Sequence, residues 1–287
     1  MIKKVLITAP EGVNYEQSRQ LSLQVKSYLS EQNVVAHLAG DIDMPDIQPD
    51  IVVAIGGDGT IMRAMKKYSQ YGVPTFGING GRLGFLAGAE RDNWREALLR
   101  LLVDDYCVEE RLALQFEFGG RIHGPFVNEV KIADESRVMF YQADIGKRTF
   151  WHAVESLGLF LATATGSTAE HFSNRGGPMF PTSMDVSLMP KNPQQVGFDP
   201  FKFPQLSQGE SVTLTFLGGA HGETEVDVVA DGIKISNNGA LLQAGESLII
   251  SKAPKPMLLA TFGLEQFFRA LEQKKGYPLS RNNFPGR

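Results

Sequence analysis

Three glycines surround a single aspartate directly after an apolar run that is typical of a buried strand. The run is Ile51–Ile55, and the residues that follow it are Gly56, Gly57, Asp58, Gly59 and Thr60. Glycines allow backbone N–H groups to approach an anion closely, and the N-terminus of a following helix adds a favourable dipole, so this segment predicts a phosphate site. An ionised aspartate would repel that phosphate unless it accepts a proton or meets a metal ion. The alternative is that Asp58 only caps the helix that starts near Thr60.

A second glycine-rich loop follows the next predicted strand. It spans Gly77–Leu86 and contains Asn79, Arg82 and Phe85. Because ligands of a doubly wound sheet bind beyond the carboxyl ends of its strands, we expect both loops to share one crevice. Arg82 would neutralise a phosphate there, and Phe85 would lie under a base. One such loop alone is more often plain turn chemistry, but two loops at successive parallel strands favour a ligand site.

Small hydroxyl residues gather in a third segment, which is followed by Ser173. Its members are Thr163, Ala164, Thr165, Gly166, Ser167, Thr168 and Ala169. Such residues offer hydrogen-bond donors and acceptors with little bulk, as a surface that contacts a nucleotide needs. A helix-capping cluster is the structural alternative, and it is the commoner explanation for an isolated run. A further polar pair, Asn128-Glu129, interrupts a strand pattern, so one of the two must point inward, toward the core or a ligand.

The first hundred residues alternate short β-branched runs with longer helical patterns, which indicates βαβ units around a parallel sheet. The expected strands are Val5–Ala9, Val34–Leu38, Ile51–Ile55 and Thr75–Ile78, and the expected helices are Gln17–Glu31, Thr60–Tyr71 and Asn93–Leu102. This half of the chain is therefore predicted to be a doubly wound α/β domain.

From about Asp105 strand-like runs follow one another with turn residues between them, which predicts a β-rich second domain. The expected elements are a hairpin of Leu112–Phe118 and Arg121–Ile132 turning at Gly119-Gly120, strands Val138–Ile145, Phe150–Val154, Val212–Leu217, Glu225–Val229 and Ser247–Ile250, a long ordered loop over Pro178–Pro204, and a final helix Phe262–Gln273.

The composition excludes several classes of protein. The chain has 287 residues, of which 43% are hydrophobic and 21% charged, as in a soluble globular protein of about two domains. A net charge of −4 argues against a nucleic-acid partner, and no apolar run reaches the roughly 18 residues of a membrane span. Lys274, Lys275 and the arginines beyond them are too few for a nucleic-acid arm and indicate a solvated tail. The single Cys107 favours a reducing, cytoplasmic location, and the histidines lack the spacing of a metal site.

Five separated motifs resemble, in order, those of the NAD kinase family and together cover most of the chain. They are GGDGT at Gly56–Thr60, N-x-G-x-L-G-F-L at Asn79–Leu86, Asn128-Glu129, T-x-T-G-S-T-A at Thr163–Ala169, and Asp231-Gly232. GGDG alone would also admit diacylglycerol, sphingosine and phosphofructokinase relatives, whereas the hydroxyl-rich run narrows the resemblance to the NAD kinases. The resemblance implies an α/β domain at residues 1–104 with a returning C-terminal helix at 257–287, and a β-sandwich-like domain at 105–256.

By this resemblance the chain phosphorylates NAD at the adenosine 2′-hydroxyl with ATP, and Asp58 takes the proton from that hydroxyl. Mg²⁺ would arrive with ATP, so catalysis is mainly positioning and electrostatics. The resemblance also implies an even-numbered homo-oligomer, a dimer or a tetramer. The expected binding residues for ATP and the dinucleotide are Gly56, Gly57, Gly59, Thr60, Arg82, Phe85, Asn128, Glu129, Thr163, Thr165, Gly166, Ser167, Thr168, Ala169 and Ser173.

The departures from the family pattern fall on the acceptor side. Leu157 replaces an aspartate that helps to hold the nicotinamide end, Glu170 replaces a tyrosine, and Ala164 replaces a proline; one extra residue precedes Gly176. Losing a charged hydrogen-bond partner typically changes binding by about 1.5–3 kcal/mol, and Glu170 or His171 are candidate replacements. The alternatives are a kinase of another adenosine-containing nucleotide and a nucleotide-binding regulator without turnover. The intact phosphate motif argues against the regulator.

Overall fold

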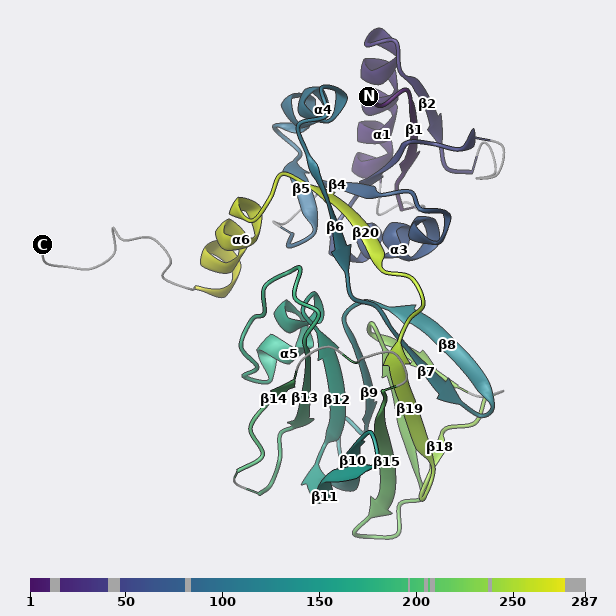
Figure 1. Ribbon diagram of the computed structural model, residues 1–287, viewed down its shortest axis with the longest axis vertical. Coiled ribbons are helices and arrows are strands. Elements are labelled where there is room, and N and C mark those ends of the chain that lie inside the picture. The colour runs from purple at the N-terminus through teal and green to yellow at the C-terminus, as the bar shows by residue number, and fades with distance from the viewer. Residues whose placement is uncertain are drawn as a thin grey trace, which may run out of the picture. The chain divides into compact units, whose positions relative to one another are not determined.

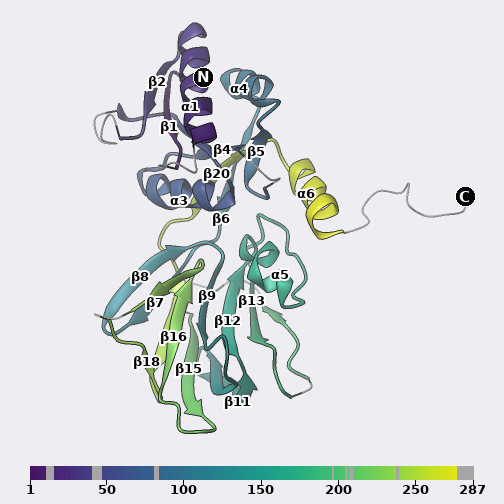
Figure 2. The same ribbon diagram turned by 180° about the vertical axis from the view of Figure 1, so that it is seen from behind.

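The computed structural model divides the chain into two compact units, shown from opposite sides in Figure 1 and Figure 2. It describes residues 1–10, 16–40, 47–80, 84–195, 197–203, 206, 210–236 and 239–276. Unit 1 comprises Met1–Glu110 and Met257–Arg287, and unit 2 comprises Arg111–Pro256. Unit 1 mixes helices and strands, whereas unit 2 consists mainly of sheets.

A largely parallel sheet forms the centre of unit 1. Its described strands are β1 (Lys4–Thr8), β2 (Val35–Leu38), β3 (Ile51–Ile55), β4 (Thr75–Asn79), β5 (Ala87–Glu90), β6 (Cys107–Arg111) and β20 (Met257–Thr261), in the order β2-β1-β3-β4-β20-β6, with β5 also paired to β4. The pairings from β2 through β20 are parallel. All five residues of β3 are buried, which explains its continuous apolar sequence. The carboxyl ends of β3 and β4 therefore lie at the same edge of the sheet.

Four helices and one 3₁₀ turn complete the described part of unit 1. They are α1 (Glu16–Glu31), α3 (Asp58–Tyr68), η2 (Ser69–Tyr71), α4 (Trp94–Leu102) and α6 (Glu265–Lys275). α1 buries Leu21, Val25 and Leu29 at intervals of one helical turn, and these side chains join a core with the sheet. None of the helices in the described residues has the length and apolar character needed to cross a membrane.

Two antiparallel sheets make up most of unit 2. The first contains β7 (Leu114–Phe118), β8 (Arg121–Phe126), β10 (Met139–Ile145), β11 (Arg148–Ser156), β15 (Val212–Gly219) and β19 (Ser247–Lys252), in the order β11-β10-β15-β19-β7-β8. The second contains β9 (Glu129–Ala133), β12 (Gly158–Thr163), β13 (Val186–Lys191), β14 (Phe201–Phe203), β16 (Glu225–Ala230), β17 (Ile233–Ile235) and β18 (Leu242–Gln243), in the order β14-β13-β12-β9-β16-β17, with β18 on β16. Phe116 and Leu214 of the first sheet share one buried core with Val130 and Leu161 of the second. Two short helical turns follow β12, η3 (Gly166–Thr168) and α5 (Glu170–Ser173).

The prediction of one continuous strand over Arg121–Ile132 is wrong. β8 ends at Phe126 and pairs with β7, whereas β9 begins at Glu129 and pairs with β12 and β16 in the other sheet. The chain passes between the sheets at Val127 and Asn128, whose backbone N–H groups are bonded to the Asp231 carboxylate instead of to a strand. Local alternation does not reveal this change of sheet, because it depends on pairing with β12 and β16 farther along the chain.

The prediction of a long loop over Pro178–Pro204 is also wrong, because the segment contains β13 and β14. Pro190 lies within β13 and lacks an N–H donor, which normally argues against a strand. β14 pairs only with residues Val186–Leu188, so no described strand pairs with Pro190 on the β14 side. Proline is tolerated there because the ladder does not need its missing hydrogen bond.

The C-terminal segment begins as a strand and not as a helix. Met257–Thr261 forms β20 beside β4, and α6 starts only at Glu265, after Gly263 in a left-handed conformation. Lys274 lies in the last turn of α6, so the expectation that it belongs to a solvated tail is wrong.

Candidate active site

The Asp58 carboxylate is held by the second glycine-rich loop and not by its own helix. α3 begins at Asp58, and its N-cap residue is Gly57, whose backbone is extended. Asp58 Oδ2 accepts a hydrogen bond from the Phe85 N–H at 3.0 Å, and Oδ1 accepts one from the Leu86 N–H at 3.0 Å. The interpretation of Asp58 as only a helix cap is therefore wrong. Its side chain is 33% exposed, so the carboxylate is fixed in direction and still open to a reactant.

The two glycine-rich loops lie side by side in unit 1. β3 and β4 pair with Ile55 opposite Ile78, and the Gly56 N–H donates to the Ile78 carbonyl at 2.9 Å. The Gly80 N–H in turn donates to the Gly56 carbonyl at 3.3 Å. The expectation that strand order brings these loops together is confirmed. Arg82, the predicted phosphate contact, lies outside the described residues.

Two glycines leave space for the side chains of Thr60 and Asp58. A Cβ atom on Gly56, which has φ +155°, would lie 2.7 Å from Thr60 Oγ1, and one on Gly84 would lie 2.3 Å from Asp58 Oδ1. A larger residue at either position would have to displace Thr60 or the carboxylate. Gly59 is exposed in the first turn of α3, where backbone N–H groups and the helix dipole favour an anion. The arrangement suits a phosphate chain beside a carboxylate.

In unit 2, Asp231 fixes the turn that precedes Glu129. Its carboxylate accepts the N–H of Val127 at 3.0 and 3.1 Å and the N–H of Asn128 at 2.7 Å. The Asp231 N–H donates to the Glu129 carbonyl at 3.0 Å. The late Asp-Gly motif is thereby bonded to the Asn-Glu motif, although 104 positions separate Val127 from Asp231.

Glu129 is the inward-pointing member of the Asn-Glu pair. It is 4% exposed, and within the described part of the chain its Oε2 atom has no hydrogen-bond partner. Burial above all, with the negative charges of Asp231 and Glu170, raises the pKa of Glu129 to about 8 against the opposing charge of Lys131. Glu129 is therefore mainly protonated at neutral pH, and its carboxyl group can donate a hydrogen bond as well as accept one.

The hydroxyl-rich segment turns tightly around Gly166. The Thr163 N–H donates to the Asn128 carbonyl at 2.9 Å, and a Cβ on Gly166 would lie 2.0 Å from that carbonyl oxygen. The hydroxyls of Thr163 and Ser167 are buried and donate to backbone carbonyls of unit 2. These side chains hold the turn in shape and do not face solvent.

Other members of the same segment have different surroundings. Thr165 is buried, and its hydroxyl accepts a hydrogen bond from the Arg111 guanidinium at 3.4 Å. Thr168 and Ala169 are half-buried, and Ser173 is exposed on α5. Thr168, Ala169 and Ser173 are therefore the members of the predicted set that a ligand of unit 2 can reach without rearrangement.

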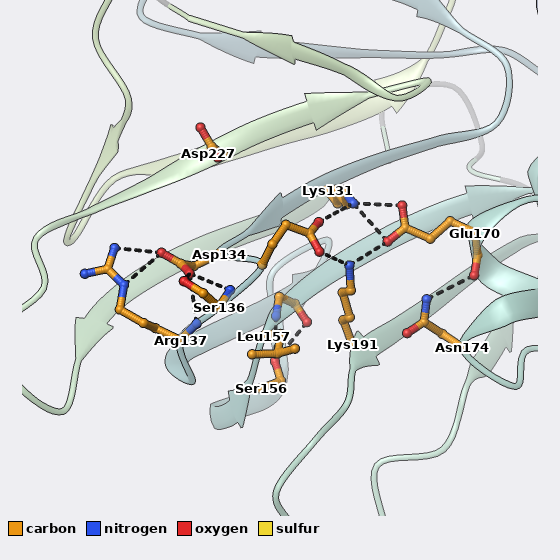
Figure 3. Close-up of polar contacts among 12 residues, drawn as sticks. Lys131, Asp134, Ser136, Arg137, Ser156, Leu157, Glu170, Asn174, Lys191 and Asp227 are labelled. Atoms are coloured by element: carbon orange, nitrogen blue, oxygen red, sulfur yellow. Dashed lines mark hydrogen bonds and ion pairs between the residues drawn. The ribbon is translucent and has the colours of Figure 1, made fainter.

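A network of two lysines and two glutamates lies on the second sheet of unit 2, as Figure 3 shows for its labelled members. Lys131 Nζ lies 2.7 Å from Glu170 Oε2 and 3.1 Å from Glu135 Oε1. Lys191 Nζ lies 3.0 Å from Glu170 Oε1 and also pairs with Glu135. Burial raises the pKa of Glu170, but hydrogen bonds from both lysines outweigh it and hold that pKa below its usual value. Glu170 is thus an ionised member of a closed ion-pair network.

Neither Leu157 nor His171 presents a polar group to a ligand. The polar backbone atoms of Leu157 are used internally, since its N–H donates to the Lys191 carbonyl and its carbonyl accepts from the Asp134 N–H, each at 2.9 Å. His171 is fully buried, with Nε2 2.8 Å from Ser187 Oγ. Burial lowers the pKa of His171 to about 4, so the ring is neutral at physiological pH.

Comparison with known proteins decides the family. The NAD kinase of Heliobacterium modesticaldum is 31% identical to this chain over 233 residues, which cover 79% of the chain and 78% of that protein. The chain belongs to the NAD kinase family. The family model described as the ATP-NAD kinase N-terminal domain matches residues 8–106. The NAD kinase of Nitratidesulfovibrio vulgaris, a further family member, is 29% identical over 288 residues, 95% of this chain and 96% of that protein.

Solved structures support the same fold. An NAD kinase from Archaeoglobus fulgidus in complex with ATP superposes with a TM-score of 0.71 at 21% identity, covering 93% of this chain and 96% of that one. A yeast NADH kinase complexed with NADH gives a TM-score of 0.80 at 17% identity, covering 99% and 90%. The likeness supports the fold of the NAD kinase family for this chain.

The sequence motifs do not predict two lysines that lie near the candidate site, Lys131 and Lys274. Lys131 stands two positions after Glu129 on β9, so both side chains project from the same face of the sheet. The signal is a lysine that stands between the apolar residues Val130 and Ile132. Lys274 gave no such signal, because its approach to Asp58 depends on where α6 packs.

Proposed function

We propose that this chain transfers the γ-phosphoryl group of ATP to the adenosine 2′-hydroxyl of NAD, giving NADP and ADP. Its membership of the NAD kinase family supports the proposal. The structural observation that carries it is the Asp58 carboxylate, which two backbone N–H groups hold at the first turn of α3 while the side chain remains partly exposed.

Asp58 is the proposed proton acceptor. Its two backbone hydrogen bonds fix the direction of the carboxylate and leave further lone pairs on each oxygen for a hydroxyl proton. As the 2′-oxygen forms its bond to the γ-phosphorus, the proton passes to Asp58 and the bond to the bridging oxygen of ADP breaks. A general base of this kind contributes typically about 10²–10⁴-fold to the rate.

The phosphates of ATP are assigned to the glycine-rich N-terminus of α3. Gly57 and Gly59 would offer backbone N–H groups at the positive end of that helix. The N–H groups of Gly56 and Thr60 are bonded to the carbonyls of Ile78 and Gly57, so these two residues would hold the shape of the turn. Mg²⁺ enters as part of the ATP substrate, bound to its phosphate oxygens, and reduces the charge that develops on the transferring group. Phe85, whose N–H bonds to Asp58, links the second loop to the same carboxylate.

Recognition of the acceptor is assigned to residues of unit 2. Asn128 and the protonated Glu129 offer donors and acceptors to sugar hydroxyls, and Asp231 holds them in position. Thr163, Gly166 and Ser167 maintain the adjacent turn, and Thr165 is bonded to Arg111. The residues of this segment that would contact the acceptor are Thr168, Ala169 and Ser173.

A second candidate acceptor is another adenosine-containing nucleotide. The observation that favours it is the combination of an apolar Leu157 with a Glu170 that two lysines already engage. We further propose that the enzyme is cytoplasmic and that it forms an even-numbered homo-oligomer. Light scattering after size-exclusion chromatography would measure the number of subunits.

The deciding experiment is phosphoryl transfer by the purified protein with ATP and Mg²⁺. NAD, NADH and smaller adenosine nucleotides serve as acceptors, and Asp58→Asn is compared with Asp92→Asn, which changes an exposed aspartate of the same unit. NADP formation that is lost in Asp58→Asn and kept in Asp92→Asn supports the proposal. Phosphorylation of a different nucleotide supports the second candidate. ATP binding without any turnover would refute both.

A further inference from the structure

Helix α6 brings a lysine to the Asp58 carboxylate within unit 1. Lys274 Nζ lies 3.8 Å from Asp58 Oδ2, and the two side chains are 32% and 33% exposed. The same ammonium group lies 5.2 Å from the centroid of the Phe85 ring. Lys274 is therefore placed at both residues that define the carboxylate site, although it comes from the opposite end of the sequence.

The packing of α6 fixes this position. Phe267, Leu271 and Lys274 recur at helical spacing and share one face, on which Leu271 is 4% exposed. The Phe267 ring packs against the Phe85 ring with centroids 6.2 Å apart. Two turns of helix thus anchor α6 on the loop that also bonds Asp58. This packing places the Lys274 side chain near the Asp58 carboxylate.

The ion pair itself is weak and exchangeable. At 3.8 Å and one-third exposure, such a pair contributes little to stability, because solvent competes for both charges. A triphosphate carries several negative charges and would attract the ammonium group more strongly than one carboxylate does. Release of Lys274 would also leave the Asp58 oxygen open to the substrate hydroxyl.

We propose that Lys274 is a phosphate-binding residue that pairs with Asp58 in the absence of nucleotide and transfers to the triphosphate of ATP when it binds. The inference deepens the proposed function and rests on its assignment of the ATP phosphates to the glycine-rich N-terminus of α3. It assigns to α6 a role in nucleotide binding beyond the stability of the fold.

Equilibrium binding of Mg²⁺-ATP and of inorganic tripolyphosphate tests this role, because tripolyphosphate has phosphates and no base. Lys274→Gln is compared with Lys275→Gln, which removes a neighbouring charge from the same last turn of α6 and so has the same effect on the helix dipole. We expect Lys274→Gln to weaken both ligands about 10- to 100-fold, as the loss of a charged hydrogen bond does. Lys275→Gln should bind both as the wild type does, and Lys274→Arg should recover most of the affinity.

Three results would overturn the inference: wild-type affinity in Lys274→Gln, an equal loss in Lys275→Gln, or a loss for ATP without one for tripolyphosphate. If Lys274 has a purely structural role, both Lys274→Gln and Lys274→Met should lower the melting temperature. Both variants should then bind ATP and tripolyphosphate with wild-type affinity at low temperature. The binding assay needs no acceptor, so it separates this inference from the proposed reaction. If NAD is not phosphorylated but tripolyphosphate binds through Lys274, only the proposed reaction fails.

Discussion

Replacement of Glu129 by Gln should alter how the stability of unit 2 depends on pH. The pKa of Glu129 rises from its ordinary value of 4.5 to about 8 in the folded chain, chiefly because the carboxyl group is buried. A group that binds its proton more tightly when folded makes folding less favourable as pH rises between the two values. At about 1.4 kcal/mol for each pH unit, the difference between 4.5 and about 8 amounts to about 5 kcal/mol.

The assay is urea unfolding at pH 5, 7 and 9, followed by tryptophan fluorescence. The chain has two tryptophans, and Trp94→Phe leaves Trp151 as a probe that lies in unit 2. In this background we expect Glu129→Gln to match the parent near pH 5 and to exceed its free energy of unfolding by several kcal/mol at pH 9. Glutamine keeps a donor and an acceptor but cannot ionise, which isolates the cost of the buried charge.

The control is Glu117→Gln, which changes an exposed glutamate of the same unit. It should leave the pH dependence of the parent unchanged. If the parent and Glu129→Gln lose stability in parallel between pH 5 and 9, then Glu129 is not protonated in the folded chain, and its assigned role as a hydrogen-bond donor to the acceptor is refuted.

Three further changes test the geometry. Gly84→Ala should lower kcat by at least about tenfold, because its Cβ would lie 2.3 Å from Asp58 Oδ1, and steady-state kinetics with unchanged thermal stability would check this. The chain with His171 should lose about 3 kcal/mol of stability as the pH falls from 6.5 to 4, because the imidazole, whose pKa is about 4 when folded, protonates more readily in the unfolded chain. His171→Asn should not show this loss, and acid unfolding curves would measure the difference. Lys131→Met should cost about 3 kcal/mol in urea unfolding by leaving Glu170 less well paired, and the double variant with Glu170→Gln should cost less than the two single variants together.

Short-range patterns predict two elements of unit 1 closely, the strand that leads to Asp58 and the first helix. The strand predicted at Ile51–Ile55 has those bounds, and the helix predicted at Gln17–Glu31 begins one residue earlier. Apolar periodicity determined both, because each element buries one continuous run or one face. The positions of β9 and β13 depend instead on pairing with strands far along the chain, which no local pattern contains.

The same division applies to the site. The meeting of the two glycine-rich loops followed from strand order, since β3 and β4 are neighbours and both run toward the same edge. The orientation of the Asp58 carboxylate did not follow, because its partners are backbone N–H groups 27 and 28 positions away. The approach of Lys274 required knowledge of how α6 packs.

The acceptor side shows how a tertiary contact settles a choice that residue types leave open. Glu170 and His171 were equal candidates to replace the polar group lost at Leu157. His171 is fully buried against Ser187, so it cannot reach a ligand without opening α5. Glu170 remains 26% exposed but is ionised and bonded to two lysines. A ligand group that approaches Glu170 must therefore compete with ammonium donors already in place, and recognition there would involve the ion-pair network as a unit. Because this network already engages Glu170, the acceptor assay includes adenosine nucleotides other than NAD.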